Sequence, residues 1–93
     1  MNRILIHKEI AKDIHEFVVE APAIAKAAIP GQFVIVMADD RGERIPLTIA
    51  DFDRAQGTLT LVLMAIGTST RKIAALPQGA DLFAVAGPLG MAS

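Results

Sequence analysis

The sequence has no cysteine, no tryptophan and no tyrosine, and its only aromatic residues are 4 phenylalanines. Without cysteine, the chain can form neither disulfides nor thiolate metal sites, which fits a cytoplasmic location. With so few aromatic side chains, it lacks the stacking platforms on which single-stranded nucleic acids are usually bound.

An excess of charge of either sign is also absent. The 9 lysines and arginines nearly balance the 10 aspartates and glutamates, which gives a net charge of −1. Proteins that bind nucleic acid through its phosphates present a basic stripe or patch. The sequence shows no such stripe, so we expect no nucleic-acid partner.

Long hydrophobic runs are missing as well. The longest, residues 59–67, is interrupted by Thr60 and ends in glycine, whereas a helix that spans a bilayer needs roughly 20 apolar residues. The first residues, 1–8, contain only three consecutive apolar positions, too few for the core of a signal peptide. We therefore expect no membrane association.

What is present is a short, apolar chain with the pattern of an all-β domain. Its 93 residues, 53% of them hydrophobic, suit one domain. β-Branched and alternating segments predict six strands, at residues 3–10, 14–20, 32–37, 45–50, 58–66 and 81–86. Six short strands favour an antiparallel arrangement closed into a barrel, because closure removes exposed strand edges.

The segments between these strands carry turn and helix signals. One short helix is predicted at 71–76, and the alanine-rich segment 22–29 fits either a helical turn or a loop. The polar segment 51–57 is predicted as a hairpin loop, and the glycine-rich segment 87–90 as a closing connector.

The segment Arg44-Ile45-Pro46-Leu47-Thr48-Ile49 combines a guanidinium, a proline and a hydroxyl in an otherwise apolar strand. A buried arginine without a partner is costly, and a proline removes one hydrogen bond of a strand ladder. A planar guanidinium can donate two parallel hydrogen bonds to a phosphate, and a threonine hydroxyl can meet a polar ring edge. The combination favours ligand contact, although Thr48 alone is an ordinary strand residue and Pro46 alone can mark an edge strand.

The turn Gly67-Thr68-Ser69-Thr70 follows the most apolar strand and precedes the predicted helix. Such a turn exposes backbone N–H groups and the positive end of a helix, which together form an anion site. The same residues could serve only as a helix N-cap. Together with Arg44 on another strand, they suit a diphosphate better than either feature alone.

Other polar residues give no catalytic pattern. His7 and His15 lie on different predicted strands with no carboxylate or second histidine at ligand spacing, so we expect a structural or surface role for each. No nucleophile–base pair and no pair of carboxylates can be assigned. The sequence therefore indicates no catalytic residue and no metal ligand.

Four motifs, in this order, resemble the FAD-binding domain of the ferredoxin–NADP reductase superfamily: Pro30-Gly31-Gln32-Phe33, the segment from Arg44 to Ile49, the turn from Gly67 to Thr70, and Gly87-Pro88-Leu89-Gly90. Within the superfamily, the chain resembles the electron-transfer subunit of dihydroorotate dehydrogenase. It resembles still more the alpha subunit of NADH-dependent reduced ferredoxin:NADP oxidoreductase and the similar sulfide dehydrogenase subunit. The resemblance implies a six-stranded antiparallel Greek-key barrel that binds FAD.

The resemblance also implies which residues hold the cofactor. The Arg44 region, which includes the cofactor-binding residue Pro46, would reach the FAD diphosphate, and Thr48 would lie near the flavin N5 edge. The remaining contacts would come from two groups of residues. The diphosphate would meet Gly67, Thr68 and Ser69, whereas the ring and ribityl chain would meet the side chain of Leu47 and the backbone of Leu63, Met64 and Ala65.

The chain departs from the common pattern of the superfamily at two positions. Arginine usually stands three residues before the Ser or Thr, but that position is Ile45 here and Arg44 lies one residue earlier. A β-bulge could restore the direction of its side chain. Leu47 stands where many relatives have an aromatic ring, so the packing against the flavin would be aliphatic.

In such relatives an NAD(P)-binding domain and a cysteine-rich [2Fe–2S] segment follow the barrel, and the present sequence has neither a Gly-x-Gly-x-x-Gly motif nor cysteine. We therefore expect residues 1–93 to be the FAD-binding domain of a longer oxidoreductase and to be inactive alone. The longer protein would move electrons between NAD(P)H, FAD and an iron–sulfur cluster or ferredoxin, together with a catalytic partner subunit. The alternative is a cofactor-free β-barrel module for protein interaction or oligonucleotide binding.

Overall fold

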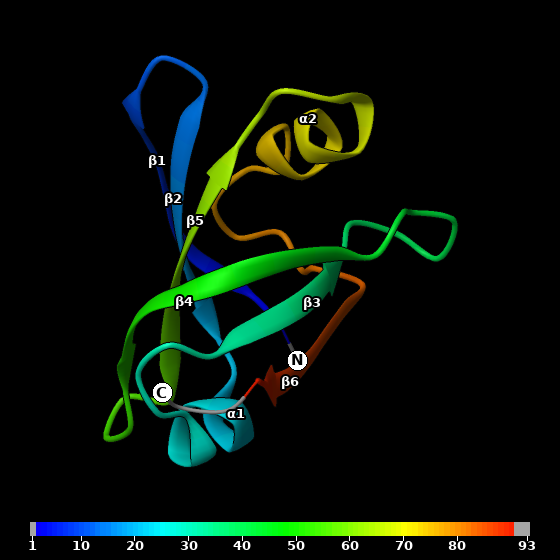
Figure 1. Ribbon diagram of the computed structural model, residues 1–93. Helices are drawn as coiled ribbons and strands as arrows, with labels where there is room; N and C mark the ends of the chain where they lie inside the picture. Colours follow the sequence, from blue (N-terminus) through cyan, green and yellow to red (C-terminus); the bar gives the residue numbers. More distant parts are fainter. Residues whose placement is uncertain (1, 91–93) are drawn as a thin grey trace.

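The computed structural model describes residues 2–90 of the chain. These residues form six strands and two short helices, whose arrangement can be followed in Figure 1. In chain order they are β1 (Ile4–Ala11), β2 (Ile14–Glu20), α1 (Pro22–Ala27), β3 (Phe33–Met37), β4 (Ile45–Asp53), β5 (Thr58–Met64), α2 (Thr68–Ala74) and β6 (Ala84–Leu89).

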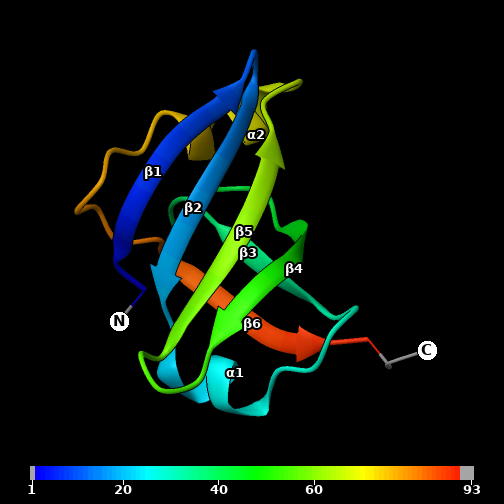
Figure 2. The same cartoon turned by 90° about the vertical axis from the view of Figure 1, so that its left-hand side faces the viewer.

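The strands form one antiparallel sheet in the order β1-β2-β5-β4-β3-β6. Strands β3, β4 and β5 follow one another as neighbours, and β6 returns to pair with β3, which is the Greek-key arrangement. The return connection contains α2. Figures 1 and 2 show β1, β2 and β5 running together while β4, β3 and β6 cross them. The all-β, six-stranded antiparallel Greek-key prediction is confirmed.

Closure of the barrel differs from the expectation. Among the described residues, no strand ladder joins the two outer strands, β1 and β6. Instead, the segment before β6 bonds to the start of β1: Gly79 N donates to Ile4 O at 2.7 Å, Ile4 N donates to Ala80 O at 2.8 Å, and Leu82 N donates to Asn2 O at 3.0 Å. The sheet is barrel-like but open, and a short irregular segment bridges its edges.

Two helices are present where one was predicted. The segment that fitted either a turn or a loop forms α1, with Pro22 in its first turn, where a proline costs no hydrogen bond. Helix α2 begins at Thr68 rather than at residue 71, because Gly67 is its N-cap and the Thr70 hydroxyl bonds back to Gly67. The residues predicted to precede the helix form its first turn.

Three strands differ from their predicted bounds by two residues or more, and one of them, β5, ends at Met64 and not at residue 66. Strand β4 continues through three residues of the predicted hairpin loop, because Phe52 pairs with Leu59 and leaves only residues 54–57 to make the turn. Strand β6 lies at Ala84–Leu89, not at 81–86, and it includes most of the predicted connector. Pro88 is tolerated there because β6 pairs only with β3, so one side of the strand needs no N–H donor.

The core is a single cluster of small and branched apolar side chains around the sheet's inner face. Alternate residues of the strands supply it, as the two-residue period of a strand requires. Full burial of such side chains contributes roughly 1.5–3 kcal/mol each. The largest fully buried ones are Phe17, Ile4, Leu59, Leu61, Leu63 and Ile73. In the described part of the chain, neither helix is long and apolar enough to cross a membrane.

Candidate functional site

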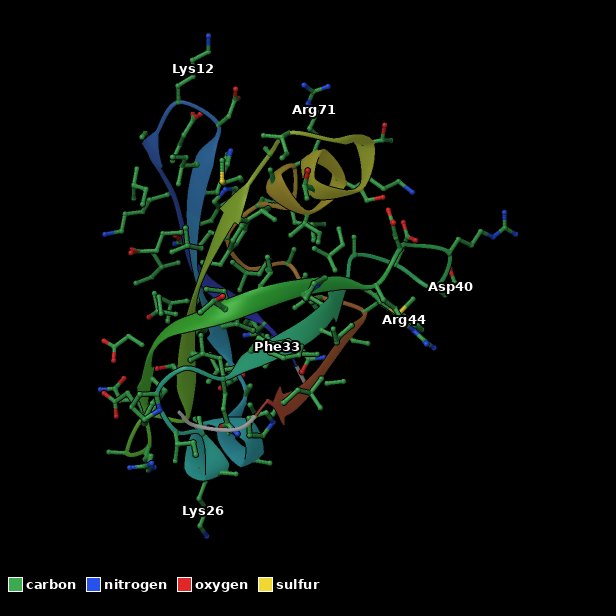
Figure 3. The ribbon with its side chains drawn as sticks, viewed as in Figure 1. Lys12, Lys26, Phe33, Asp40, Arg44 and Arg71 are labelled. Carbon is green, nitrogen blue, oxygen red and sulfur yellow. The ribbon has the colours of Figure 1, made fainter. Side chains whose placement is uncertain are left out.

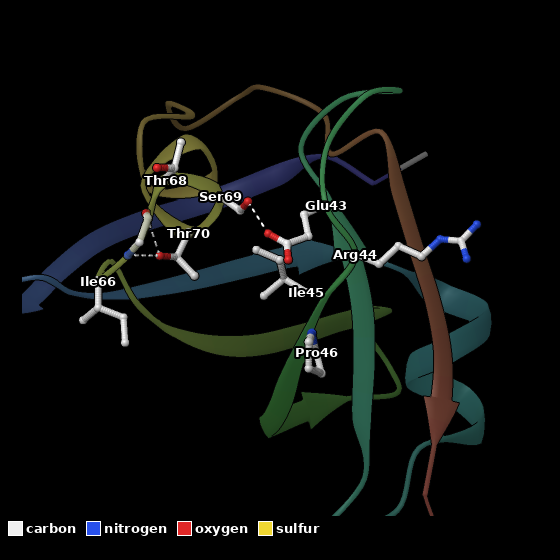
Figure 4. A pocket seen from close by; sticks show the side chains of 9 residues that line it. Glu43, Arg44, Ile45, Pro46, Ile66, Thr68, Ser69 and Thr70 are labelled. Atoms are coloured by element: carbon white, nitrogen blue, oxygen red, sulfur yellow. Dashed lines mark hydrogen bonds between the residues drawn. The ribbon is translucent and has the colours of Figure 1, made fainter.

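A cavity of about 500 Å³ lies between the start of β4 and the turn into α2 (Figure 4). It is open to solvent and is lined by two segments far apart in the sequence, Glu43 to Pro46 and Ile66 to Thr70. These are the two segments in which the sequence predicts ligand contacts. The fold therefore brings the arginine–proline segment and the glycine turn to one site.

The cavity exists because β4 and β5 part from one another. Their pairing ends at Ile49 and Leu61. From there toward its start β4 pairs only with β3, as in the pairing of Thr48 with Phe33, while β5 continues beside β2 as far as Met64. Pro46 lies in the part of β4 that has a single partner strand, which is where a missing N–H donor is tolerated.

The turn into α2 is held by its own hydrogen bonds. Gly67 is extended, with φ −139°, and its N–H donates to Thr70 Oγ1 at 2.9 Å. The Thr70 hydroxyl donates in turn to Gly67 O at 3.0 Å. Because the first N–H groups of a helix have no intrahelical acceptor, the backbone N–H groups of Thr68 and Ser69, which both line the cavity, are available as donors. Thr70 acts as a cap, and the two residues before it are the ones placed to meet a ligand.

Charged side chains do not lie as the sequence suggests. The Arg44 side chain points away from the cavity (Figures 3 and 4) and borders a separate hollow beside Met37 and Ala84. Its neighbour Glu43 points inward instead and accepts a hydrogen bond from Ser69 Oγ. Sequence reasoning missed Glu43, because the direction of side chains in an irregular loop is set by the loop's conformation and not by a period.

Strand alternation decides which β4 side chains can meet a ligand. Pro46 and Thr48 are exposed on the outer face of the sheet, whereas Leu47 is only 7% exposed and belongs to the core cluster. The predicted contact of the Leu47 side chain with the ring would need that side chain on the outer face, whereas it packs inward. Thr48 is exposed on the outer face, but it is two residues further along β4 than Pro46 and does not line the cavity.

The end of β5 supplies backbone groups as well as side chains. Ala65 N donates to Asp13 O at 2.8 Å, which directs its backbone toward β2. Since successive residues of a strand turn their N–H and C=O groups to opposite sides, Leu63 also faces β2, while Val62 and Met64 face the gap where β4 departs. Met64 is 55% exposed, and Ala65 is buried. Of the three predicted residues only Met64 turns its backbone to the gap. Val62, which the prediction omitted, follows from the same alternation.

Two histidines that the sequence left apart lie together beneath the end of α2. His7 Nε2 and His15 Nδ1 are 2.8 Å apart, and His7 Nδ1 is 2.8 Å from Leu76 O. A carbonyl only accepts, so in the neutral pair His7 Nδ1 carries the proton and His15 donates to His7 Nε2. The His7 ring also stacks on the Phe17 ring, with 4.2 Å between the two ring centroids. This network fixes the end of α2 to β1 and β2, and so helps to hold the helix that lines the cavity.

Within residues 2–90, no group of three or more His, Cys, Asp or Glu side chains is arranged to hold a metal ion. The described phenylalanines do not form a shared platform either: Phe17 is buried, Phe33 and Phe52 are half-buried, and Phe83 is exposed on the segment before β6. The Arg54 guanidinium lies over the Phe52 ring, 4.8 Å from the ring centroid, in a cation–π contact.

Known proteins resemble the chain over almost its whole length, although no protein-family model matches it. A Clostridium beijerinckii protein described as "Uncharacterized protein in adh 3'region" is 45% identical over 93 residues, which are 100% of this chain and 31% of that protein. The dihydroorotate dehydrogenase B (NAD(+)) electron transfer subunit homolog of Thermotoga maritima is 37% identical over 90 residues, which are 97% of this chain and 32% of that protein.

A solved structure gives a matching result. It comes from work on flavin-based electron bifurcation by an NADH-dependent reduced ferredoxin–NADP oxidoreductase. Its TM-score is 0.97 at 36% identity, and the match covers 100% of this chain and 34% of that chain. The chain thus spans about a third of the length of the proteins that it matches.

Proposed function

Because the chain is a ferredoxin–NADP reductase-like domain, homologous to electron-transfer subunits of dihydroorotate dehydrogenase B, we propose that it binds FAD as the flavin domain of a longer electron-transfer protein. One observation carries this proposal. The cavity unites the Arg44–Pro46 region with the turn from Gly67 to Ser69, two segments that the sequence independently associates with a diphosphate.

The residues around the cavity fit the parts of FAD. The backbone N–H groups of Thr68 and Ser69, with their hydroxyls, are donors suited to a diphosphate. Pro46 and Ile66 supply exposed apolar walls against which a ring system can pack, and Ile66 is 72% exposed. This mixture of apolar walls and a few converging polar groups is typical of cofactor sites.

Bound FAD supplies the exchange of electrons in pairs or singly. In the proposed site the chain's own residues bind and orient that group. Gly67 would leave space for the diphosphate, because it has no side chain and a Cβ added there would meet only Thr70 Oγ1, at 3.9 Å. The Thr48 hydroxyl and the backbone of Met64 would meet polar edges of the ring from two diverging strands. Arg44 would approach the diphosphate only after its side chain turns from the direction seen in Figure 4.

We propose that the longer protein is an oxidoreductase subunit that moves electrons between NAD(P)H, FAD and an iron–sulfur cluster or ferredoxin, beside a catalytic partner subunit. The homology to electron-transfer subunits and the likeness to a bifurcating oxidoreductase support this role. In the proposal the 93 residues provide the flavin site, and the nicotinamide and iron–sulfur sites lie in other parts of the protein.

The alternative, a cofactor-free interaction or oligonucleotide-binding module, has less support. Such modules combine a basic groove with aromatic side chains on which bases stack. Here the net charge is −1, and the cavity is lined by Glu43 and by hydroxyl residues rather than by aromatic rings.

Titration of the 93-residue chain with FAD, FMN, riboflavin and ADP tests the proposal. At a free concentration 100 times its dissociation constant, FAD should stabilise the fold by about 2.7 kcal/mol, a rise in melting temperature of about 10 °C or more. Riboflavin, which has no phosphate, should bind more weakly. No shift with any of the four ligands at millimolar concentration would refute FAD binding by this chain.

A variant pair locates the binding site. Gly67→Ala should lower the melting temperature by only about 4–8 °C, because alanine is roughly 1 kcal/mol less favourable than glycine at a helix N-cap, while the added methyl group meets no atom closer than 3.9 Å. It should weaken FAD binding by about fivefold, since the methyl group narrows the cavity at the proposed diphosphate position. Gln56→Ala, an exposed residue in the β4–β5 turn, is the control and should bind FAD as the unchanged chain does. Equal affinity in all three chains would place the ligand elsewhere.

A further inference from the structure

We propose that Glu43 regulates ligand entry to the cavity by competing with the ligand's phosphate groups for Ser69. The inference rests on the proposed function and concerns a residue that neither the sequence motifs nor the family resemblance selects. In the structure Ser69 Oγ donates to the Glu43 carboxylate across the cavity (Figure 4). A diphosphate that binds at Ser69 therefore meets a carboxylate already in place.

The Glu43 carboxylate forms no salt bridge with another described residue, although Arg41 and Lys72 line a second hollow beside it. Among the described residues, the salt bridges join Lys8 to Glu16 and Lys72 to Asp39, and neither includes Glu43. Helix α2 carries two cations: Asp39 already binds Lys72 at 3.6 Å, and Arg71 is exposed and points outward from the helix (Figure 3). The Arg44 guanidinium, next to Glu43 in the chain, points away from the cavity. A bound diphosphate would therefore meet a negatively charged carboxylate that no salt bridge to these lysine and arginine side chains neutralises.

The position of Glu43 allows it to leave. It lies in the loop between β3 and β4, it is exposed, and its described side-chain bond is the one to Ser69. Exposed ion pairs and hydrogen bonds of this kind contribute little to stability, so displacement of Glu43 costs the fold little. The cost appears instead in ligand affinity, because each binding event has to break the Ser69–Glu43 bond and overcome the repulsion.

Three ligands and four chains test the proposal. Glu43→Gln removes the charge, and Glu43→Ala removes the acceptor as well. Asp40→Asn removes the same charge from an exposed residue of the same loop that does not line the cavity, and it serves as the matched control. Binding of FAD, ADP and riboflavin to each variant and to the unchanged chain is measured by calorimetry, after melting curves have shown that all four chains are folded.

The proposal requires that both Glu43 variants bind FAD and ADP about fivefold more tightly than the unchanged chain. Riboflavin binding should not change, and Asp40→Asn should behave as the unchanged chain does. If the unchanged chain binds FAD and the Glu43 variants bind it equally or more weakly, Glu43 does not compete and the proposal is wrong. It is also wrong if riboflavin affinity rises as much as FAD affinity. Failure of every chain to bind any ligand would instead refute the proposed function itself.

Discussion

At the scale of single residues, Leu47 shows how the face of a strand decides a role. The family resemblance places this residue against the flavin ring, but in the structure it is 7% exposed and packs in the core, while its neighbour Thr48 is exposed. We predict that Leu47→Ala lowers the free energy of unfolding by about 2–4 kcal/mol, because it leaves a cavity in a packed interior.

Urea denaturation of the two neighbours checks this assignment of faces. Thr48→Ala, on the outer face, should change the free energy of unfolding by less than about 0.5 kcal/mol. The opposite ranking, with Leu47→Ala harmless to the fold and Thr48→Ala damaging, would mean that the two side chains have exchanged faces.

Residue-level prediction from the sequence rests most securely on local chemistry. Gly67, Thr68 and Ser69 line one cavity together with Pro46, and a glycine before hydroxyl residues is a local signal for a helix start; their contact with a cofactor stays a prediction. Sequence reasoning did not find two other features, because the answer there needs tertiary structure. The inward turn of Glu43 depends on the loop conformation, and the contact of His7 with His15 depends on a diagonal position across the β1–β2 hairpin.

At the scale of elements, the turn between β4 and β5 packs tightly on the start of α1. Gly57 has φ +70°, its carbonyl accepts a bond from Ala21 N at 2.9 Å, and a Cβ added to it would lie 3.1 Å from Pro22 Cα. Gly79 has a similar backbone, with φ +94°, but a Cβ there would meet nothing within 4 Å. Substitution of Gly79 therefore introduces backbone strain alone, whereas substitution of Gly57 introduces backbone strain and crowding against Pro22.

We predict that Gly79→Ala costs about 1–2 kcal/mol of unfolding free energy, from the left-handed backbone alone. Gly57→Ala should cost more, because Pro22 or the turn also has to move. Denaturant unfolding of both variants against the unchanged chain measures the difference. Equal losses would show that the turn and α1 are not in close contact.

Element boundaries were predictable only where local signals end an element. Strand β2 occupies the predicted residues, whereas β6 begins three residues later than predicted. Leu82 is buried between two exposed residues, as in a strand, but its N–H bonds to Asn2 O and Phe83 N bonds to Met37 O before the regular ladder begins. A pattern of burial cannot distinguish a strand from an extended segment that passes between two partners.

At the scale of the whole molecule, the two outer edges of the sheet are joined by a few backbone hydrogen bonds and not by a strand ladder. The order β1-β2-β5-β4-β3-β6 leaves β1 and β6 as outer strands, and the segment before β6 bridges to the start of β1 through Ile4, Gly79 and Leu82. The number and direction of the strands could be predicted from their patterns. The manner of closure could not, because irregular backbone pairing has no sequence period.

This bridge predicts a pattern of hydrogen exchange. Ile4 and Leu82 are 0% and 4% exposed and belong to the same core cluster as β2 and β5. Opening the bridge would expose both side chains, so we expect the amides of Ile4, Gly79 and Leu82 to exchange only through unfolding of most of the molecule. Their protection should match that of Leu61 in β5 within about 1 kcal/mol. The amide of Arg41, in the exposed β3–β4 loop where it bonds only to the Asp39 carboxylate, is the control and should exchange rapidly. Protection at the bridge that falls near the level of Arg41 would mean that the sheet opens at this edge while the rest stays folded.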